Sequence, residues 1–170
     1  MAQTSDCDFQ EMSTPTGAHE KLKPFAGTFR AEVKIWMGPG EPMASTGTMT
    51  STFDLGGRFL NQRYVGDPSE GPFSNFEGRG YWGFNKATSK YEGFWIDTAS
   101  TVMQTDSGDV DESGTVWTMI GSMPGQQPGT TTKKRSVITL KDNDRHSIEM
   151  YFEGPDGSEV KGMEIQYTRA

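Results

Sequence analysis

Short runs in which apolar and polar residues alternate make up most of this chain, and no long amphipathic helix interrupts them. In the run FRAEVKI, the apolar side chains of Phe29, Ala31, Val33 and Ile35 fall on one parity and the charged residues on the other. A period of two is typical of a β-strand with one buried face. The sequence therefore predicts an all-β protein.

Turn-forming residues separate these runs at short intervals. The chain has 21 glycines and 9 prolines among 170 residues, which suits many tight turns. Such a series predicts a single antiparallel up-and-down β-barrel, because closing removes the edges of the sheet. A two-sheet sandwich is the alternative, since strand patterns do not distinguish closure from stacking. About ten strands are expected, over residues 29–36, 45–53, 58–65, 73–85, 90–97, 100–108, 115–122, 131–140, 146–153 and 159–169.

The N-terminal part of the chain follows a different pattern. Residues 1–17 lack periodicity and are expected to form a flexible tail that is loose or lightly docked. Residues 18–25, AHEKLKPF, predict a short helix with Leu22 and Phe25 on its buried side. A helix this short needs a partner, so we expect it to close one end of the barrel. Residues 18–170 then form a single β-barrel domain.

Charge and cysteine content argue against several classes of function. The net charge of -7 leaves no basic face for nucleic acid or for an anionic membrane surface. No apolar run approaches the roughly 18 residues that a membrane-spanning helix needs. Cys7 is the single cysteine, so an intramolecular disulfide is impossible, and we expect a reduced, cytoplasmic protein.

Two glycine-containing motifs resemble ligand-binding loops but favour structural explanations. GRGYWG at residues 78–83 matches a dinucleotide pattern, yet its flanks are strand-like and no helix N-terminus follows to bind a pyrophosphate. DVDESG at residues 109–114 begins like a calcium loop, but Ile120 occupies the position of the bidentate Glu. We expect a bent strand and a solvated hairpin turn, respectively.

The histidines and the basic cluster also favour ordinary roles. His19 and His146 lie far apart in the sequence, so no metal site is expected. We expect polar or capping roles for them, with His146 near a rim, rather than axial ligation of haem. The cluster Lys133, Lys134 and Arg135 stands at the start of a strand, where it predicts a solvated guard of a sheet edge.

Polar residues that share strands with large aromatic residues are the candidates for a ligand site. In a barrel, one parity of each strand faces the lumen. The sequence does not fix that parity for these strands, because both sides carry aromatic or apolar residues. If they face inward, they line a polar and aromatic lumen; otherwise they form outer charge pairs or a buried structural network. The candidates are Arg79, Tyr81, Trp95, Asp97, Glu149, Tyr151 and Glu164.

Several stretches together resemble the bacterial domain-of-unknown-function family fifteen seventy-nine. The resemblance covers the chain from about Ala18 to the C-terminus and implies a calycin-like barrel, akin to lipocalins, fatty-acid-binding proteins and nitrobindins. It identifies no activity. The matching stretches are HEKLKPFAGTF (19–29), KIWMGPGEP (34–42), LGGRFLNQRY (55–64), FEGRGYWGFNKATSKY (76–91), FWIDT (94–98), IEMYFEGPDGSE (148–159) and MEIQYTR (163–169).

The resemblance also implies how the barrel closes. Calycins often pack the ring of a Gly-x-Trp motif under an Arg of the last strand, and the matching residues here are Gly27, Phe29 and Arg169. Phe29 replaces the Trp, which removes the indole N–H but keeps a large ring. Nitrobindins bind haem through a histidine near the C-terminus, but this chain has no histidine after His146, so no cofactor is expected.

Three hypotheses about function follow. The preferred one is binding of a small apolar or aromatic molecule in the lumen. The second is an enzyme, less favoured, that uses Glu149, Tyr151 and Arg79 in acid–base chemistry. The third is a structural barrel that acts through its rim or as a homodimer, with an exposed Trp36 in the contact patch.

Overall fold

The structure is a computed structural model that describes residues 6–71, 73–125 and 127–170. Within these residues the chain forms ten antiparallel strands, which confirms the all-β prediction. The strands are β1 (Gly27–Ile35), β2 (Met43–Asp54), β3 (Phe59–Gly66), β4 (Glu77–Asn85), β5 (Lys90–Asp97), β6 (Gln104–Val110), β7 (Val116–Pro124), β8 (Thr131–Leu140), β9 (Arg145–Glu153) and β10 (Glu159–Arg169).

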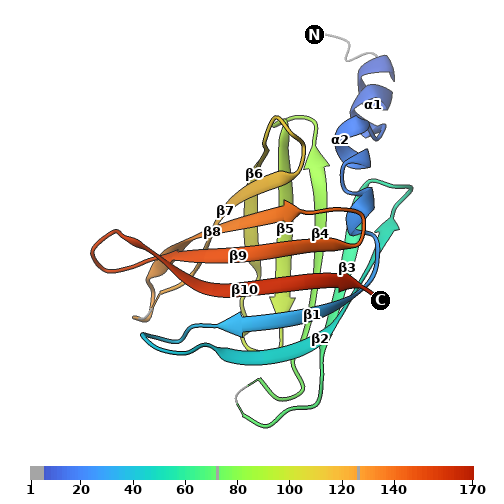
Figure 1. The fold of residues 1–170 in the computed structure, drawn as a ribbon. Coiled ribbons are helices and arrows are strands. Elements are labelled where there is room, and N and C mark those ends of the chain that lie inside the picture. Colours follow the sequence, from blue (N-terminus) through green and yellow to red (C-terminus); the bar gives the residue numbers. More distant parts are fainter. Residues whose placement is uncertain (1–5, 72, 126) are drawn as a thin grey trace.

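The ten strands close into a barrel in which each strand pairs with its neighbours in sequence. Closure comes from the pairing of β1 with β10, which runs from Phe29 opposite Arg169 to Ile35 opposite Met163. In Figure 1, β8, β9, β10 and β1 cross in front of β4 and β5. The barrel prediction is therefore confirmed, and the sandwich alternative is not.

Three short helical segments precede the barrel: α1 (Asp6–Ser13), α2 (Gly17–Glu20) and the 3-10 helix η1 (Lys23–Phe25). Leu22 and Phe25 are 0% and 2% exposed and belong to the same apolar cluster as inward-facing barrel residues. The hydroxyl group of Tyr91 on β5 donates to the carbonyl oxygen of Ala18 at 3.0 Å. The segment from α2 to η1 therefore plugs one end of the barrel, as predicted.

Two local features hold this plug in place. The backbone N–H of Thr16 donates to Nδ1 of His19 at 3.0 Å and caps α2, which confirms the predicted capping role. Lys86, in the turn after β4, donates to the carbonyl oxygens of Glu11 and Thr14. Helix α1 thus lies in the stretch where the sequence predicts a tail, and it touches the barrel through the Lys86 ammonium group.

Arg169 closes the plugged end from the last strand. Its guanidinium carbon lies 4.4 Å from the ring centroid of Phe29, which is 0% exposed. Its Nη1 and Nη2 atoms donate to the carbonyl oxygens of Ala26 and Pro24, each at 3.0 Å. Gly27 adopts a φ of 130°, and a Cβ there would overlap Arg169, so glycine is needed at this position. This is the arrangement that the calycin resemblance implies.

Every second side chain along each of the first two strands points into the barrel. On β1 the residues Phe29, Ala31 and Val33 are buried while the charged residues between them are exposed. On β2 the threonines face outward, because Met49 and Ser51 occupy the buried parity. Among the described residues, no helix has the length and apolar character needed to cross a membrane.

Candidate functional site: the open half of the barrel lumen

The two ends of the lumen differ in how deeply their inward-facing side chains are buried. Near the plug, Leu60 is 0% exposed, and partly buried side chains such as Phe84 pack against the same apolar cluster. At the opposite end, Trp95, Met150 and Met163 share the inward parity and are partly exposed. Partly exposed side chains of the inward parity mark this end as the candidate entrance to the lumen. We call this half of the lumen the mouth.

Glycines in β4 allow the ring of Trp95 to lie against the barrel wall. Gly78 and Gly80 both have the inward parity, and Gly80 pairs with Trp95 across the strands. A Cβ on Gly80 would lie 2.9 Å from Cε3 of Trp95, and one on Gly78 would overlap its six-membered ring. The indole therefore covers two glycines of the neighbouring strand. A ring placed in this way lines the mouth without crossing it.

A buried lysine is the most unusual residue of the lumen. Lys134 on β8 faces inward, and only 5% of its side chain is exposed. Its Nζ lies 3.5 Å from Oδ2 of Asp106 and 3.5 Å from Oε1 of Gln104, both on β6. Gly121 on β7 stands between Asp106 and Lys134 in the pairing and leaves room for the contact across that strand. We call Gln104, Asp106 and Lys134 the lumen polar cluster.

The ionisation of Asp106 reflects this position. Burial raises the pKa of the Asp106 carboxyl group, and the nearby ammonium group of Lys134 opposes that rise only in part. Buried charges are stable when they are paired closely and fully hydrogen bonded. At 3.5 Å the pair with Lys134 is loose, so this half of the lumen holds a charge pair that is incompletely satisfied.

Other polar groups inside the barrel also lack partners. Among the described residues, the hydroxyl groups of Ser51 and Ser136 are buried without a hydrogen bond, and so are Nε1 of Trp82 and Nδ1 of His146. Ser136 has the inward parity and lies two residues from Lys134 on β8. Buried polar groups normally have a partner, either in the protein or in a bound molecule or water. Of these groups, Ser136 is the one beside Lys134, where a polar atom from outside the chain would give its hydroxyl group a partner.

The structure brings two of the predicted ligand residues into the lumen. Trp95 and Asp97 have the inward parity on β5, opposite Gly80 and Gly78. Nε1 of Trp95 donates to Oδ2 of Asp97 at 3.1 Å. Asp97 therefore holds the indole in place at the mouth.

Arg79 and Tyr81 lie on the outer face, where strand alternation places them because the inward parity of β4 belongs to Gly78, Gly80 and Trp82. Arg79 is exposed. The hydroxyl group of Tyr81 donates to Oδ2 of Asp54 at 2.9 Å. Neither residue lines the lumen.

Glu149, Tyr151 and Glu164 also lie outside, because the intervening residues of β9 and β10 point inward. The ammonium group of Lys161 pairs with both carboxylates, at 3.1 Å from Oε2 of Glu164. The guanidinium carbon of Arg135 lies 4.3 Å from the ring centroid of Tyr151. These residues therefore form charge pairs on the outer face, which was the expected alternative to a lining of the lumen. Glu149, Tyr151 and Arg79 therefore form no acid–base set in the lumen.

The sequence prediction for the basic cluster is wrong at Lys134. A closed barrel has no edge to guard, and alternation turns Lys134 inward between two outward residues. Arg135 instead donates to Glu159 on the outer face, with Nη2 2.7 Å from Oε2. The sequence did contain a signal for the inward position of Lys134, because strand alternation puts it on the same face as Ser136 and the apolar Ile138.

The remaining motifs have the structural roles predicted for them, apart from His146. Residues 78–83 lie within β4, with no helix following. Asp111 accepts hydrogen bonds from the backbone N–H groups of Thr115 and Val116, both at 3.0 Å, in the turn after β6. His146 is buried rather than near a rim, and its ring stacks on Tyr167 at a centroid distance of 4.5 Å. No group of three or more potential metal ligands occurs among the described residues.

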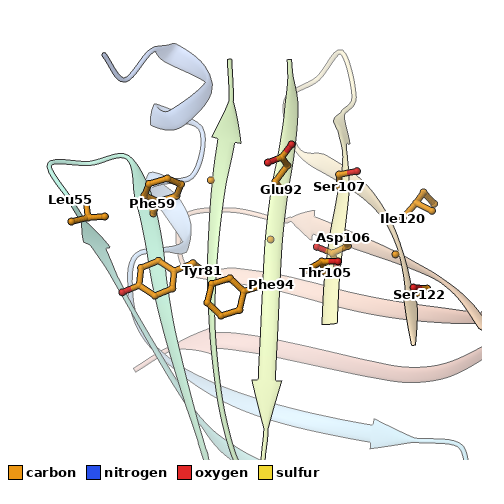
Figure 2. A pocket seen from close by; sticks show the side chains of 13 residues that line it. Leu55, Phe59, Tyr81, Glu92, Phe94, Thr105, Asp106, Ser107, Ile120 and Ser122 are labelled. Carbon is orange, nitrogen blue, oxygen red and sulfur yellow. The ribbon is translucent and has the colours of Figure 1, made fainter. Parts of the chain in front are cut away.

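A hollow lies on the outer wall over β3 to β7, and Asp106 of the lumen polar cluster is among the residues that line it (Figure 2). This groove has a volume of about 820 Å³ and is lined partly by Phe59, Ile120 and the stacked rings of Tyr81 and Phe94, whose centroids are 5.7 Å apart. Trp36 is half-buried and does not line it. A homodimer stays a prediction.

Comparisons with known proteins identify a family and a crystal structure with a similar fold. A family model described as "Protein of unknown function (DUF1579)" matches residues 14–169. The crystal structure of Rv2717c from M. tuberculosis is similar over 92% of this chain and 99% of that chain, with 14% identity and a TM-score of 0.65. A redesigned β-barrel is similar over 93% of this chain and 99% of its own, with 17% identity and a TM-score of 0.43. The comparison with curated proteins found no match.

Proposed function

The chain belongs to the DUF1579 family of proteins of unknown function, and we propose that it binds a small, largely apolar or aromatic molecule in the mouth of its barrel. The observation that carries this proposal is the partial exposure of inward-facing Trp95, Met150 and Met163 above a fully buried floor. Apolar walls with a few polar groups are typical of sites for small molecules.

The contrast between the two ends of the lumen supports a binding site rather than a barrel packed solid. The plug end carries interlocking rings, with the centroids of Phe25 and Trp82 5.1 Å apart and those of Phe25 and Trp117 5.2 Å apart. The mouth carries methionines and an indole that lies on glycines. Methionine side chains adapt to ligands of different shape, which suits a pocket wall. A calycin-like way of binding, with the ligand inside the barrel, fits this arrangement.

The test uses N-phenylnaphthylamine, a neutral fluorescent probe of apolar sites. We expect saturable binding that is accompanied by a change in tryptophan fluorescence, because Trp95 lines the mouth. Met163→Trp fills the mouth from β10 and should weaken binding by roughly tenfold or more, through loss of space and overlap with the probe. A thermal melt followed by circular dichroism checks that the variant still folds.

The matched control alters the lining of the outer groove and leaves the mouth unchanged. Tyr81→Ala combined with Phe94→Ala deletes the stacked pair on the outer wall and should leave probe affinity unchanged. The opposite pattern, with binding lost in this double variant and kept in Met163→Trp, would place the probe in the groove and refute the proposal.

A further inference from the structure

Among the described residues, the ammonium group of Lys134 has no acceptor closer than 3.5 Å, and this bears on which molecule the mouth receives. An ammonium group has three donors, and its hydrogen bonds to charged acceptors are normally about 2.7–2.9 Å long. The contacts of Lys134 with Asp106 and Gln104 are both 3.5 Å, although only 5% of the lysine side chain is exposed. The lysine itself is therefore shielded from solvent, whereas the side chain of its partner Asp106 is 21% exposed. A buried ammonium group with two distant acceptors can still bind a further, closer acceptor.

The groups around Lys134 also supply donors for an incoming ligand. Ser136 carries a hydroxyl group that is buried with no partner among the described residues, and the residue is 3% exposed. Gln104 directs its oxygen toward Lys134, so its amide N–H groups remain as donors. Asp106 is the single carboxylate of the cluster, and the buried environment disfavours its charge. The cluster thus offers positive charge and donors to an incoming acceptor.

Apolar surface adjoins this cluster on the same inner wall. Ser136 pairs with Met119 on one side and Met150 on the other, and Trp95 pairs with Gln104. A ligand that reaches Lys134 therefore has methionine and indole surfaces beside the rest of its length. The arrangement matches a molecule with one anionic end and an apolar body.

Resting on the proposed function, we infer that the ligand is an amphiphilic monocarboxylate whose carboxylate binds the ammonium group of Lys134, with the hydroxyl group of Ser136 as a second donor. The apolar body of the ligand lies toward Trp95 and the methionines of the mouth. Asp106 is the competing anion: it holds Lys134 in the free protein and opposes a second carboxylate beside it.

The experiment compares two probes that differ only in charge at one end, dansyl-labelled undecanoic acid and its methyl ester. We expect the acid to bind the wild-type protein more tightly than the ester. Lys134→Met removes the charge at nearly constant volume and should weaken acid binding by roughly tenfold or more while leaving ester binding nearly unchanged. Lys133→Met is the matched control, since Lys133 is the exposed neighbour on the same strand, and it should change neither affinity.

A second variant tests the competing role of Asp106. Asp106→Asn keeps the shape of the side chain and removes its charge, so acid binding should become tighter while ester binding stays the same. The double variant Lys134→Met with Asp106→Asn leaves no unpaired charge in the lumen polar cluster, and it replaces Lys134→Met in the experiment if that single variant does not fold. This double variant should bind the acid and the ester equally.

The outcomes separate the two proposals. If acid and ester bind the wild-type protein with equal affinity, and Lys134→Met affects neither, the carboxylate inference is overturned and the proposed function stands. If neither these probes nor N-phenylnaphthylamine binds, the proposed function fails, and this inference fails with it.

Discussion

Phe29 anchors the plugged end of the barrel. Its ring is 0% exposed, lies under the guanidinium group of Arg169 and meets the ring of His146 edge-on at a centroid distance of 4.7 Å. Phe29→Ala should lower the free energy of unfolding by roughly 3–5 kcal/mol, because it deletes a fully buried ring and leaves a cavity. Urea denaturation measures the change. Thr28→Ala, at the exposed neighbouring position, should alter stability little; equal losses in both variants would contradict the proposed packing.

His146 should make the stability of the protein sensitive to acid. Burial, followed by the positive charge of Arg169, lowers the pKa of His146 from 6.5 to about 4. Above pH 6.5 neither the folded nor the unfolded state carries this proton. Between pH 6.5 and about 4 the unfolded state binds it and the folded state does not, so stability falls as pH falls.

The measurement for His146 is urea denaturation at a series of pH values. The loss of stability attributable to this residue should reach at most about 3.5 kcal/mol, at roughly 1.4 kcal/mol per unit of pKa difference. His19, whose pKa is also lowered, likewise reduces the stability of the folded protein as pH falls. Asp106, whose pKa is raised, increases that stability as pH falls. The difference in the free energy of unfolding between wild type and His146→Gln, followed over pH, isolates the contribution of His146. If the two curves run parallel, His146 does not contribute to the pH dependence of stability.

Among the elements, α1 and the plug contribute very differently to stability. Phe9 and Met12 on α1 are 79% and 51% exposed, whereas Leu22 in the plug is 0% exposed. Removal of residues 1–13 should therefore shift the melting temperature by no more than about 4 °C, the equivalent of roughly 1 kcal/mol for a chain of this size. Leu22→Ala should cost roughly 2–5 kcal/mol. A large loss on truncation, measured by calorimetry, would show that α1 supports the barrel.

At the scale of the whole molecule, closure leaves the ten strands of the described chain without a free edge. The backbone of β1 pairs with β2 on one side and with β10 on the other. Hydrogen–deuterium exchange followed by mass spectrometry should therefore show amides of β1 and β10 exchanging as slowly as those of β4 and β5. A sandwich would leave edge strands with unpaired N–H groups, so fast exchange confined to β1 or β10 would argue against closure.

Much of the architecture could be predicted from local patterns. The alternation in β1, the threonine-coated parity of β2 and the Asp111 turn each depend on residues that are close in sequence. The presence of a strand and the position of a turn depend on such local chemistry, so both could be predicted directly from the sequence. Phe29 and Arg169 were paired through a family resemblance, because 140 residues separate them and no local pattern links them.

The candidate site was predicted only in part because both parities of several strands carry large side chains. On β4 the outward Tyr81 and the inward Trp82 are both aromatic, so alternation alone could not say which faces the lumen. Trp95 and Asp97 were expected at the site and lie inside, while Arg79 and Glu149 were expected there and lie outside. The burial of β4 against its neighbours decided the parity.

The sequence by itself determined that this chain is all-β, roughly where its strands and turns fall, and which short helix closes its end, since each follows from the local spacing of residues. The expected strands 73–85 and 100–108 begin four residues before β4 and β6, respectively. The tertiary structure alone decided closure and the lumen polar cluster. Lys134 and Asp106 meet only because β6, β7 and β8 pair in one register with Gly121 between them. That register depends on hydrogen bonds between strands, and no property of a single strand specifies it.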